Sequence, residues 1–186
     1  MTLFPFDEVN ALTQRLVEAQ KSPDTDEKRA VVDKLLDEVE EMLEMDYFYG
    51  VMDASKGIGR SIDPDVWEAE RLINEKFDGK DYRQRLTDYI YHGNEYDIKR
   101  VLETDAHRVY NGAIWNSGRR AGATTKTWNC AMLPTSRDTH VYLDGVSVGI
   151  DDEFYNYKGE STMFPGQWGI PEEDINCQCW LTLNQG

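Results

Sequence analysis

Two of the chain's three cysteines stand one residue apart in residues 175–180, which read INCQCW. If this segment is a strand, Cys177 and Cys179 point to the same side, because alternate side chains of a strand share a face. With His140, and with Cys130 as a fourth group, they would supply the sulfur and nitrogen ligands of a structural zinc site. The sequence does not show that these residues meet, and it favours the other interpretation, in which the thiols are buried as ordinary core residues.

A second candidate cluster consists of Arg137, Asp138 and His140, which stand within four positions of one another. Such residues can form an acid/base or metal-binding group, which would indicate a hydrolase, a nuclease or a transferase. They can equally form a turn in which Asp138 caps the backbone and Arg137 pairs with an acid. The sequence offers neither a paired acid/base spacing nor a nucleophile elbow in support of the enzyme hypothesis.

A third group of polar residues repeats at helical spacing. Thr104, Arg108 and Asn111 occupy positions i, i+4 and i+7, so they share one face of a helix, and Asp105 is within reach of Arg108. The same segment carries apolar residues on its inward side. Buried polar groups must be hydrogen-bonded, so the pattern favours a structural ion-pair network.

The first part of the chain, up to about residue 117, is predicted to be helical. The spacing of Val9, Leu12 and Leu16 predicts one helix, and a second helix begins at Ser22 or Thr25. Its apolar stripe ends near residue 43, opposite an acidic face, and a glycine-containing loop is expected to follow. Further helices are predicted from an N-cap at Asp63, over 82–91 and over 96–117.

Strand signals begin after residue 118, where the chain becomes rich in glycine, proline, threonine and aromatic residues. The predicted strands are 125–132, 141–143, 146–150 and 177–183, and Asp144-Gly145 reads as the turn of a hairpin between the middle two. Helices followed by strands indicate an α+β fold: a helical N-terminal half, then a small mixed domain with a short antiparallel sheet.

The charge balance limits the partners. The 186 residues include 35 acidic and 20 basic ones, for a net charge of -15, which disfavours nucleic acid and anionic membrane surfaces. We expect at most weak, salt-sensitive DNA binding through Arg119, Arg120, Lys126 and Arg137. No apolar run is long enough to span a membrane. The N-terminus lacks the pattern of a secretion signal, and three cysteines fit a reducing, cytosolic site of synthesis.

Taken in order over residues 77–180, these elements resemble the Mu F-like minor head protein family of tailed phages, also called the phage head morphogenesis domain. Each piece is weak alone, and the ordered set is what is specific. The residues that carry the resemblance are Thr104, Asp105, Arg108, Asn111, Trp128, Arg137, His140, Asp144, Gly145, Pro165, Gly166 and Asn176, followed by Cys177 and Cys179.

The resemblance implies a minor structural protein of a phage head that aids head morphogenesis, DNA packaging or ejection. Residues 77–186 would be the family domain, and residues 1–76 a helical arm that docks on portal, capsid or scaffold proteins. Such a protein is expected in the host cytoplasm during assembly and then in the virion head. Similar domains also lead toxin polypeptides; because the chain stops at Gly186, no toxin module is expected here.

Overall fold

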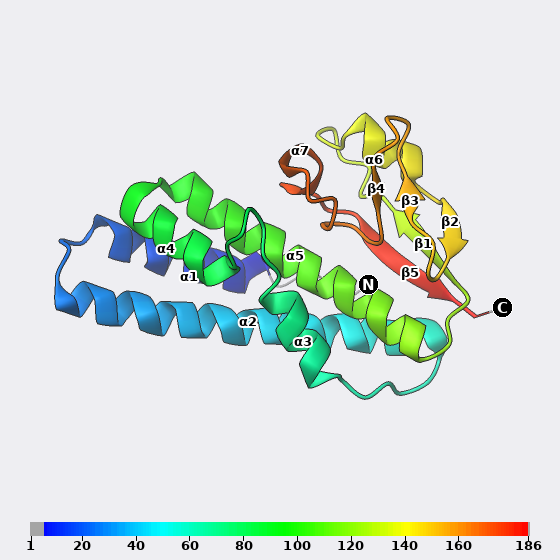
Figure 1. Cartoon of the computed structure of the whole chain (residues 1–186), viewed down its shortest axis with the longest axis horizontal. Helices are drawn as coiled ribbons and strands as arrows, with labels where there is room; N and C mark the ends of the chain where they lie inside the picture. Colours follow the sequence, from blue (N-terminus) through cyan, green and yellow to red (C-terminus); the bar gives the residue numbers. More distant parts are fainter. Residues whose placement is uncertain (1–5, 186) are drawn as a thin grey trace.

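The computed structural model describes residues 6–185, and within them five helices precede the first strand (Figure 1). The longest two, α2 and α5, lie side by side along the molecule, while α1 and α4 cover one end and α3 crosses near the middle. We call these five helices the helical layer. Its members are α1 (Phe6–Lys21), α2 (Asp26–Ile58), α3 (Val66–Ile73), α4 (Tyr82–His92) and α5 (Glu95–Arg120).

Helix α2 begins at the second of the two starts that the sequence predicts, and it ends much later than predicted. The Thr25 side chain accepts a hydrogen bond from the Lys28 backbone N–H at 3.2 Å, which caps the helix. The loop expected after residue 43 is wrong, because α2 continues through Gly50 to Ile58. A Cβ at Gly50 would lie 2.4 Å from the Tyr110 carbonyl oxygen on α5. The glycine therefore permits close packing of two helices, which outweighs its low helix propensity.

The start of α3 also differs from the prediction. Its N-cap is Asp65, whose Oδ1 accepts the backbone N–H groups of Trp67 at 3.1 Å and Glu68 at 3.3 Å. The predicted cap at Asp63 is therefore wrong by two residues. Helices α4 and α5 follow the sequence prediction closely, with N-caps at Asp81 and Asn94.

A three-stranded antiparallel sheet follows the helical layer, and its strand order is β2-β1-β5. The central strand β1 pairs through Thr127 with Ser147 on one side and Thr182 on the other. Two further short strands pair with each other. This arrangement confirms the α+β fold. The strands are β1 (Thr125–Asn129), β2 (Ser147–Gly149), β3 (Phe154–Tyr155), β4 (Ser161–Thr162) and β5 (Trp180–Asn184).

The strand predicted over 141–143 is wrong, because these residues end the short helix α6 (Asp138–Leu143). Its buried residues Thr139, His140 and Leu143 lie at helical spacing, a pattern that three apolar residues in a row cannot reveal. Asp144-Gly145 consequently joins α6 to β2 and is not a hairpin turn. A second short helix, α7 (Pro171–Asp174), precedes the paired cysteines.

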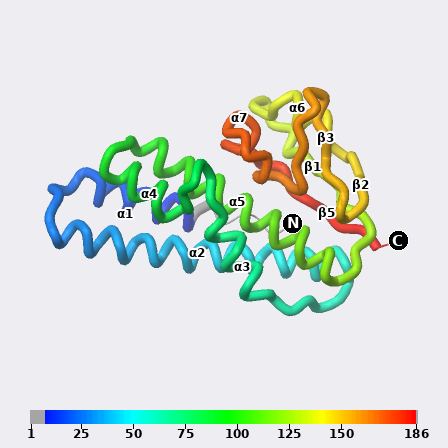
Figure 2. Tube along the Cα trace, in the orientation of Figure 1, coloured from blue at the N-terminus to red at the C-terminus, as the bar shows by residue number. Residues whose placement is uncertain are grey.

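Strand β5 attaches the sheet to the helical layer. It runs beside α5 and α2 (Figures 1 and 2), and a Cβ at Gly118 would lie 2.4 Å from Leu183 Cδ1. Helices α4 and α5 follow residue 76 but pack with α1 and α2, so the helical layer extends past the predicted domain boundary, which stays a prediction. No helix among the described residues has the length and apolar character needed to cross a membrane.

Candidate functional site

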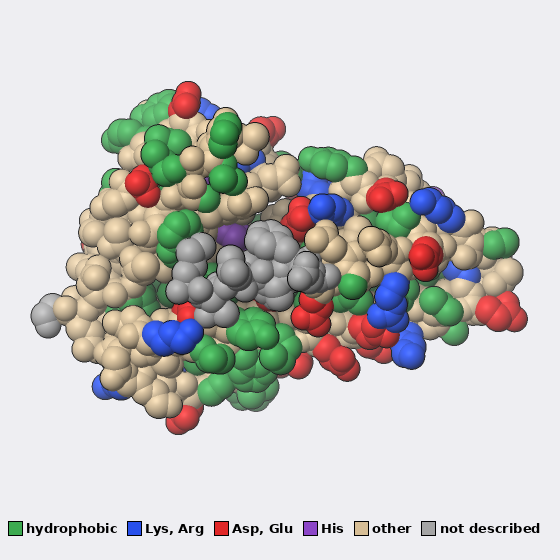
Figure 3. All heavy atoms as spheres, turned by 180° about the vertical axis from the view of Figure 1, so that it is seen from behind, with side chains coloured by type: hydrophobic (Ala, Val, Ile, Leu, Met, Phe, Trp, Pro, Cys, Tyr) green, Lys and Arg blue, Asp and Glu red, His purple; other side chains and the backbone are tan. Residues whose placement is uncertain are grey.

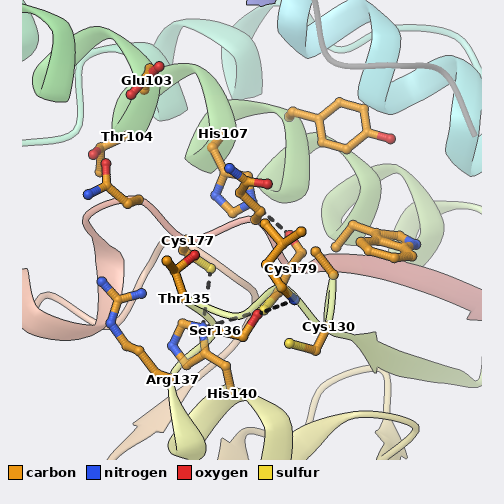
Figure 4. A pocket seen from close by; sticks show the side chains of 16 residues that line it. Glu103, Thr104, His107, Cys130, Thr135, Ser136, Arg137, His140, Cys177 and Cys179 are labelled. Atoms are coloured by element: carbon orange, nitrogen blue, oxygen red, sulfur yellow. Dashed lines mark hydrogen bonds between the residues drawn. The ribbon is translucent and has the colours of Figure 1, made fainter.

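A pocket of about 490 Å³ lies between the middle of α5, the segment after β1 and the segment before β5 (Figure 4). Helix α5 contributes Thr104 and His107 to its wall, and α6 contributes His140. Cys177 and Cys179 line it from the third segment. Residues far apart in the sequence thus surround one cavity.

Three metal-ligating side chains meet in this wall. His140 Nδ1 lies 3.5 Å from Cys177 Sγ and 3.4 Å from Cys179 Sγ, and the three ligand atoms all lie within 4.8 Å of one another. The exposed fractions of His140, Cys177 and Cys179 are 2%, 6% and 3%. The structure therefore brings together the three residues that the sequence suggests as metal ligands.

The two cysteines face the same way although they do not belong to a strand. Asn176 adopts a left-handed conformation with φ of 58°, which asparagine tolerates better than most residues. The Cys177 N–H donates to the Asp174 carbonyl at 3.2 Å, and β5 begins only at Trp180. The turn, not strand alternation, places both sulfurs beside His140.

Burial and neighbouring groups act in opposite directions on the first thiol. Burial alone would raise the pKa of Cys177, but the hydrogen bond with Cys179 and the nearby imidazoles of His107 and His140 bring that pKa well below its usual range. The pKa of Cys179 is raised by the hydrogen bond with Cys177, by burial and by Cys130. The pKa values of the two thiols are therefore shifted in opposite directions, and Cys130 contributes to the upward shift of Cys179.

On its other side, His140 meets a buried carboxylate that the sequence analysis missed. His140 Nε2 lies 3.2 Å from Glu173 Oε2, without an aligned hydrogen bond. Glu173 is 2% exposed and accepts from Thr139 Oγ1 at 2.7 Å and Lys158 Nζ at 3.2 Å. Burial opposes its ionisation, but Thr139, Lys158 and His140 together lower the pKa of Glu173. Only its place just after Pro171 in a short acidic helix could have signalled it.

The polar residues of α5 divide between two tasks. Arg108, which is fully buried, donates to Glu75 Oε2 at 2.9 Å and to Asp105 Oδ1 at 3.3 Å. Arg85 Nη2 donates to Asp105 Oδ2 at 2.7 Å. Arg108 also donates to the Leu72 carbonyl at 2.6 Å. This Arg108 cluster links α3 and α4 to α5, as the predicted ion-pair network would.

Asn111 joins α5 to the segment that carries the cysteines. Its Oδ1 accepts the Leu181 N–H at 3.1 Å, and its Nδ2 donates to the Cys179 carbonyl at 3.3 Å. His107 Nε2 lies 2.7 Å from the same carbonyl. Thr104 lines the pocket wall. The polar face of α5 thus contacts both the helical layer and the start of β5.

Several other residues that carry the resemblance pack in the core or shape the turns around the pocket. Trp128 is buried on β1, with its ring centroid 5.6 Å from that of His140. Asp144 Oδ1 accepts the Cys130 N–H at 2.8 Å, and Gly145 has a φ of 75°. Gly166, which follows Pro165, has a φ of 88°, and a Cβ there would lie 3.2 Å from Arg108 Cα. Glycine thus lets this loop approach α5.

Of the predicted cluster of Arg137, Asp138 and His140, Arg137 and His140 both line the pocket, and Asp138 does not. Arg137 donates to the Ile175 carbonyl, whereas Asp138 is exposed and does not line the pocket. The alternative, in which Asp138 caps the backbone, is wrong: Arg137 is the N-cap residue of α6, and no side chain caps it. Asp138 and His140 lie in α6, and Arg137 is its N-cap residue, so these side chains do not all point the same way.

The four cations considered for DNA contact do not form one exposed surface. Lys126 is fully buried, with Nζ 5.6 Å from the Trp115 ring centroid. Arg119 pairs with Asp151 at 2.7 Å. On the face in Figure 3, lysine and arginine side chains are interspersed with acidic ones. Since Lys126 is buried and Arg119 is paired, these four residues do not together make an exposed cationic track of the kind that holds phosphates.

Comparison with known proteins identifies the region that contains the site. The profile of the family described as "Phage Mu protein F like protein" matches residues 75–182, more than half of the chain. The NAD(+)--arginine ADP-ribosyltransferase EFV of Enterococcus faecalis is 30% identical over 115 residues, which are 58% of this chain and 23% of that protein. Minor head protein GP7 of Bacillus phage SPP1 is 29% identical over 84 residues, 44% of this chain and 27% of that protein. The chain thus spans about a quarter of each relative's length. No solved structure matches significantly.

Proposed function

The chain belongs to the Phage Mu protein F like family, and we propose that it is a minor head protein of a tailed phage that docks on the portal protein during head assembly. The observation that carries this proposal is the family match over residues 75–182, to which the likeness to the minor head protein of phage SPP1 adds. The finer elements, the portal vertex and a part in DNA packaging or ejection, belong to the proposal.

The contacts of the matched region support a structural role. Asp105 and Arg108 pair within the fold, Asn111 bridges α5 and β5, and Arg137 binds a backbone carbonyl. These side chains hold elements of the fold together, and this use supports a structural role for them. Asp138, the remaining member of the proposed enzyme cluster, is exposed outside the pocket.

The docking surface that we propose is the exposed apolar stripe of α2. Met45, Phe48 and Met52 lie at helical spacing and are 43%, 39% and 50% exposed. Figure 3 shows hydrophobic side chains gathered over the central part of α2. The exposed Glu41 and Glu44 adjoin the stripe. A portal surface with an apolar seat and basic residues at its margin would complement both features.

Co-expression with the portal protein of the same phage, followed by affinity capture and size-exclusion chromatography, tests this proposal. We expect the wild-type chain to co-elute with the portal, and Phe48→Glu to abolish co-elution because it places a charge in the apolar seat. Val66→Glu is the matched control, since Val66 is 73% exposed but lies on α3. Wild-type chain that never co-elutes, or Phe48→Glu that binds like wild type, would overturn the docking proposal.

The ADP-ribosyltransferase relative defines the competing enzymatic function. Its matched part is 23% of its length, and the buried acid nearest the pocket cluster, Glu173, already contacts Thr139, Lys158 and His140. We therefore expect no transfer of ADP-ribose from labelled NAD⁺ to arginine-containing acceptors and no release of nicotinamide. Turnover that Glu173→Gln removes without unfolding the chain would replace the structural role by an enzymatic one.

A further inference from the structure

The distances around His140 match those around a tetrahedral zinc ion. Zinc binds thiolate sulfur at about 2.3 Å and imidazole nitrogen at about 2.0–2.1 Å, so a tetrahedral site separates a bound nitrogen from a bound sulfur by about 3.5 Å. The observed separations from His140 Nδ1 are 3.5 Å to Cys177 Sγ and 3.4 Å to Cys179 Sγ. These two separations equal the nitrogen–sulfur edges of such a tetrahedron.

A fourth group lies beside these three. Cys130 follows β1, is 6% exposed and lines the same pocket. Its sulfur is not one of the three ligand atoms that lie within 4.8 Å of one another, so a shift of this side chain toward them would complete a four-ligand site. The Asp144 carboxylate holds the Cys130 N–H at 2.8 Å, which fixes the backbone that carries the thiol. Figure 4 shows Cys130, His140 and the paired cysteines converging from separate segments.

The surroundings of His140 are those of a metal-bound imidazole. Its Nε2 lies 3.2 Å from Glu173, and a carboxylate on the outer nitrogen orients the ring and makes the inner nitrogen a better ligand. The Trp168 ring stacks on the imidazole with centroids 6.0 Å apart and planes at 16°. Glu173 is in turn held by Thr139 and Lys158. The imidazole therefore presents Nδ1 to the sulfurs.

We propose that Cys130, His140, Cys177 and Cys179 bind one zinc ion as a closed structural site, with Glu173 as the carboxylate that positions His140. Three sulfurs and one imidazole nitrogen are a ligand set that zinc takes in structural sites. The ion would tie the end of β1, helix α6 and the segment before β5 to one another. With four protein ligands it has no open position for substrate, so it stabilises the fold. This site does not depend on the proposed portal docking.

Metal analysis of the purified full-length chain tests the proposal. The chain is prepared without a histidine tag, under reducing conditions and without chelator, and its zinc content is measured by elemental and native mass spectrometry. We expect one zinc per chain in the wild type. Wild-type chain that carries no zinc and gains no thermal stability when zinc is added would overturn the proposal.

Matched variants test the individual ligands. His140→Gln is expected to lose zinc, whereas His107→Gln, which changes the other pocket histidine, is expected to retain it. Glu173→Gln should retain zinc with an affinity lowered about 10–100-fold. Zinc that survives in His140→Gln at wild-type affinity would overturn the assignment of that ligand.

Cobalt substitution tests Cys130 without requiring a large change in stability. Three thiolates bound to Co²⁺ give sulfur-to-metal charge-transfer absorption, and Cys130→Ser should lower its intensity by about a third because two thiolates remain. Unchanged charge-transfer absorption in Cys130→Ser would exclude Cys130 from the site. If that variant fails to fold, the intensity measured on wild-type chain against a two-thiolate reference decides between two and three sulfurs.

Discussion

The Arg108 cluster and the cysteine–histidine cluster both lie buried in the family-matched region, yet they satisfy their polar atoms differently. Around Arg108, two arginines face two acids, Asp105 and Glu75. Around His140, one acid faces the outer nitrogen, while the inner nitrogen faces two sulfurs. The first cluster is balanced by protein charges alone. The second places soft ligands together, which a metal cation would balance.

The largest expected effect comes from breaking the balanced cluster. Arg108→Met removes a fully buried guanidinium and leaves Glu75 and Asp105 with one arginine fewer. Removal of one partner from a buried ion pair costs about 3–5 kcal/mol, so we expect the free energy of unfolding in urea to fall by about that amount. A loss below about 1 kcal/mol would show that the cluster does not hold the helices together.

A matched control separates burial from charge. Arg83→Met removes an arginine that pairs with Asp37 and Glu40 at the surface, and exposed pairs contribute about 0–1 kcal/mol. Arg108→Met should also retain zinc at the wild-type level, because its contacts lie outside the cysteine–histidine cluster. Loss of zinc in that variant would show that the two clusters act as one.

The second largest effect is expected from metal removal. A ligand at 100 times its dissociation constant stabilises the folded state by about 2.7 kcal/mol, which corresponds to about 5–10 °C in melting temperature for a chain of this size. We expect a chelator to lower the wild-type melting temperature by that amount in a calorimetric scan. His140→Gln should show no chelator effect. Equal melting of wild type with and without chelator would contradict a structural ion.

Removal of the Asn111 side chain, which links α5 to the segment that carries the cysteines, should lower the free energy of unfolding by an intermediate amount. Asn111→Ala removes the acceptor of the Leu181 N–H and one donor to the Cys179 carbonyl. Leaving such buried groups unsatisfied costs about 1–3 kcal/mol, measurable by urea unfolding. Asn116→Ala is the control, because Asn116 is also buried on α5 and its Nδ2 has no partner among the described residues. Equal losses in the two variants would count against the bridging role of Asn111.

Asp46 is a further buried ionisable group, and within residues 6–185 neither an arginine nor a set of metal ligands lies against it. Its carboxylate is fully buried on α2 and has no hydrogen-bond partner among the described residues. Burial, and secondarily the charge of Glu8, raise the pKa of Asp46 to about 8. In the unfolded chain the group ionises near pH 4, so folding takes up a proton between about pH 4 and pH 8. Wild-type stability should therefore fall as pH rises through this range.

Asp46→Asn removes this pH dependence and should give the smallest change of the series. We expect the variant to gain roughly 1–2 kcal/mol over wild type between pH 5 and pH 8, a gain discounted for local relaxation. Urea unfolding at several pH values measures it, with the exposed Asp138→Asn as control. A variant that parallels wild type across this range would mean that Asp46 is ionised in the folded chain.

The sequence predicted the elements whose cause is local. The apolar stripe of α2, the N-cap at Thr25 and the polar spacing of α5 depend on nearby residues, and the structure contains them. The end of α2 could not be predicted, because the sequence does not reveal that Gly50 packs closely against α5, 60 positions away. The run Val141–Tyr142–Leu143 is too short to distinguish strand from helix by periodicity.

The candidate site was predictable in its residue types but not in its surroundings. Cysteine, histidine and their spacing indicated His140, Cys177 and Cys179, which the structure brings together. Glu173 gave no comparable signal, because its approach to His140 depends on the turn around α7. The enzyme hypothesis included Asp138 because it is adjacent to Arg137 and near His140 in the sequence. In the structure Asp138 begins α6, and its side chain is exposed.

Both the portal docking and the zinc site can be tested in one experiment, native mass spectrometry of the chain co-expressed with the portal protein of its own phage, under reducing conditions without chelator. We predict a complex of defined stoichiometry in which each copy of this chain carries one additional zinc mass. A free chain at the mass of the apoprotein would contradict both the docking and the metal site. A complex without zinc would contradict the metal site alone, and a free chain with zinc would contradict the docking alone.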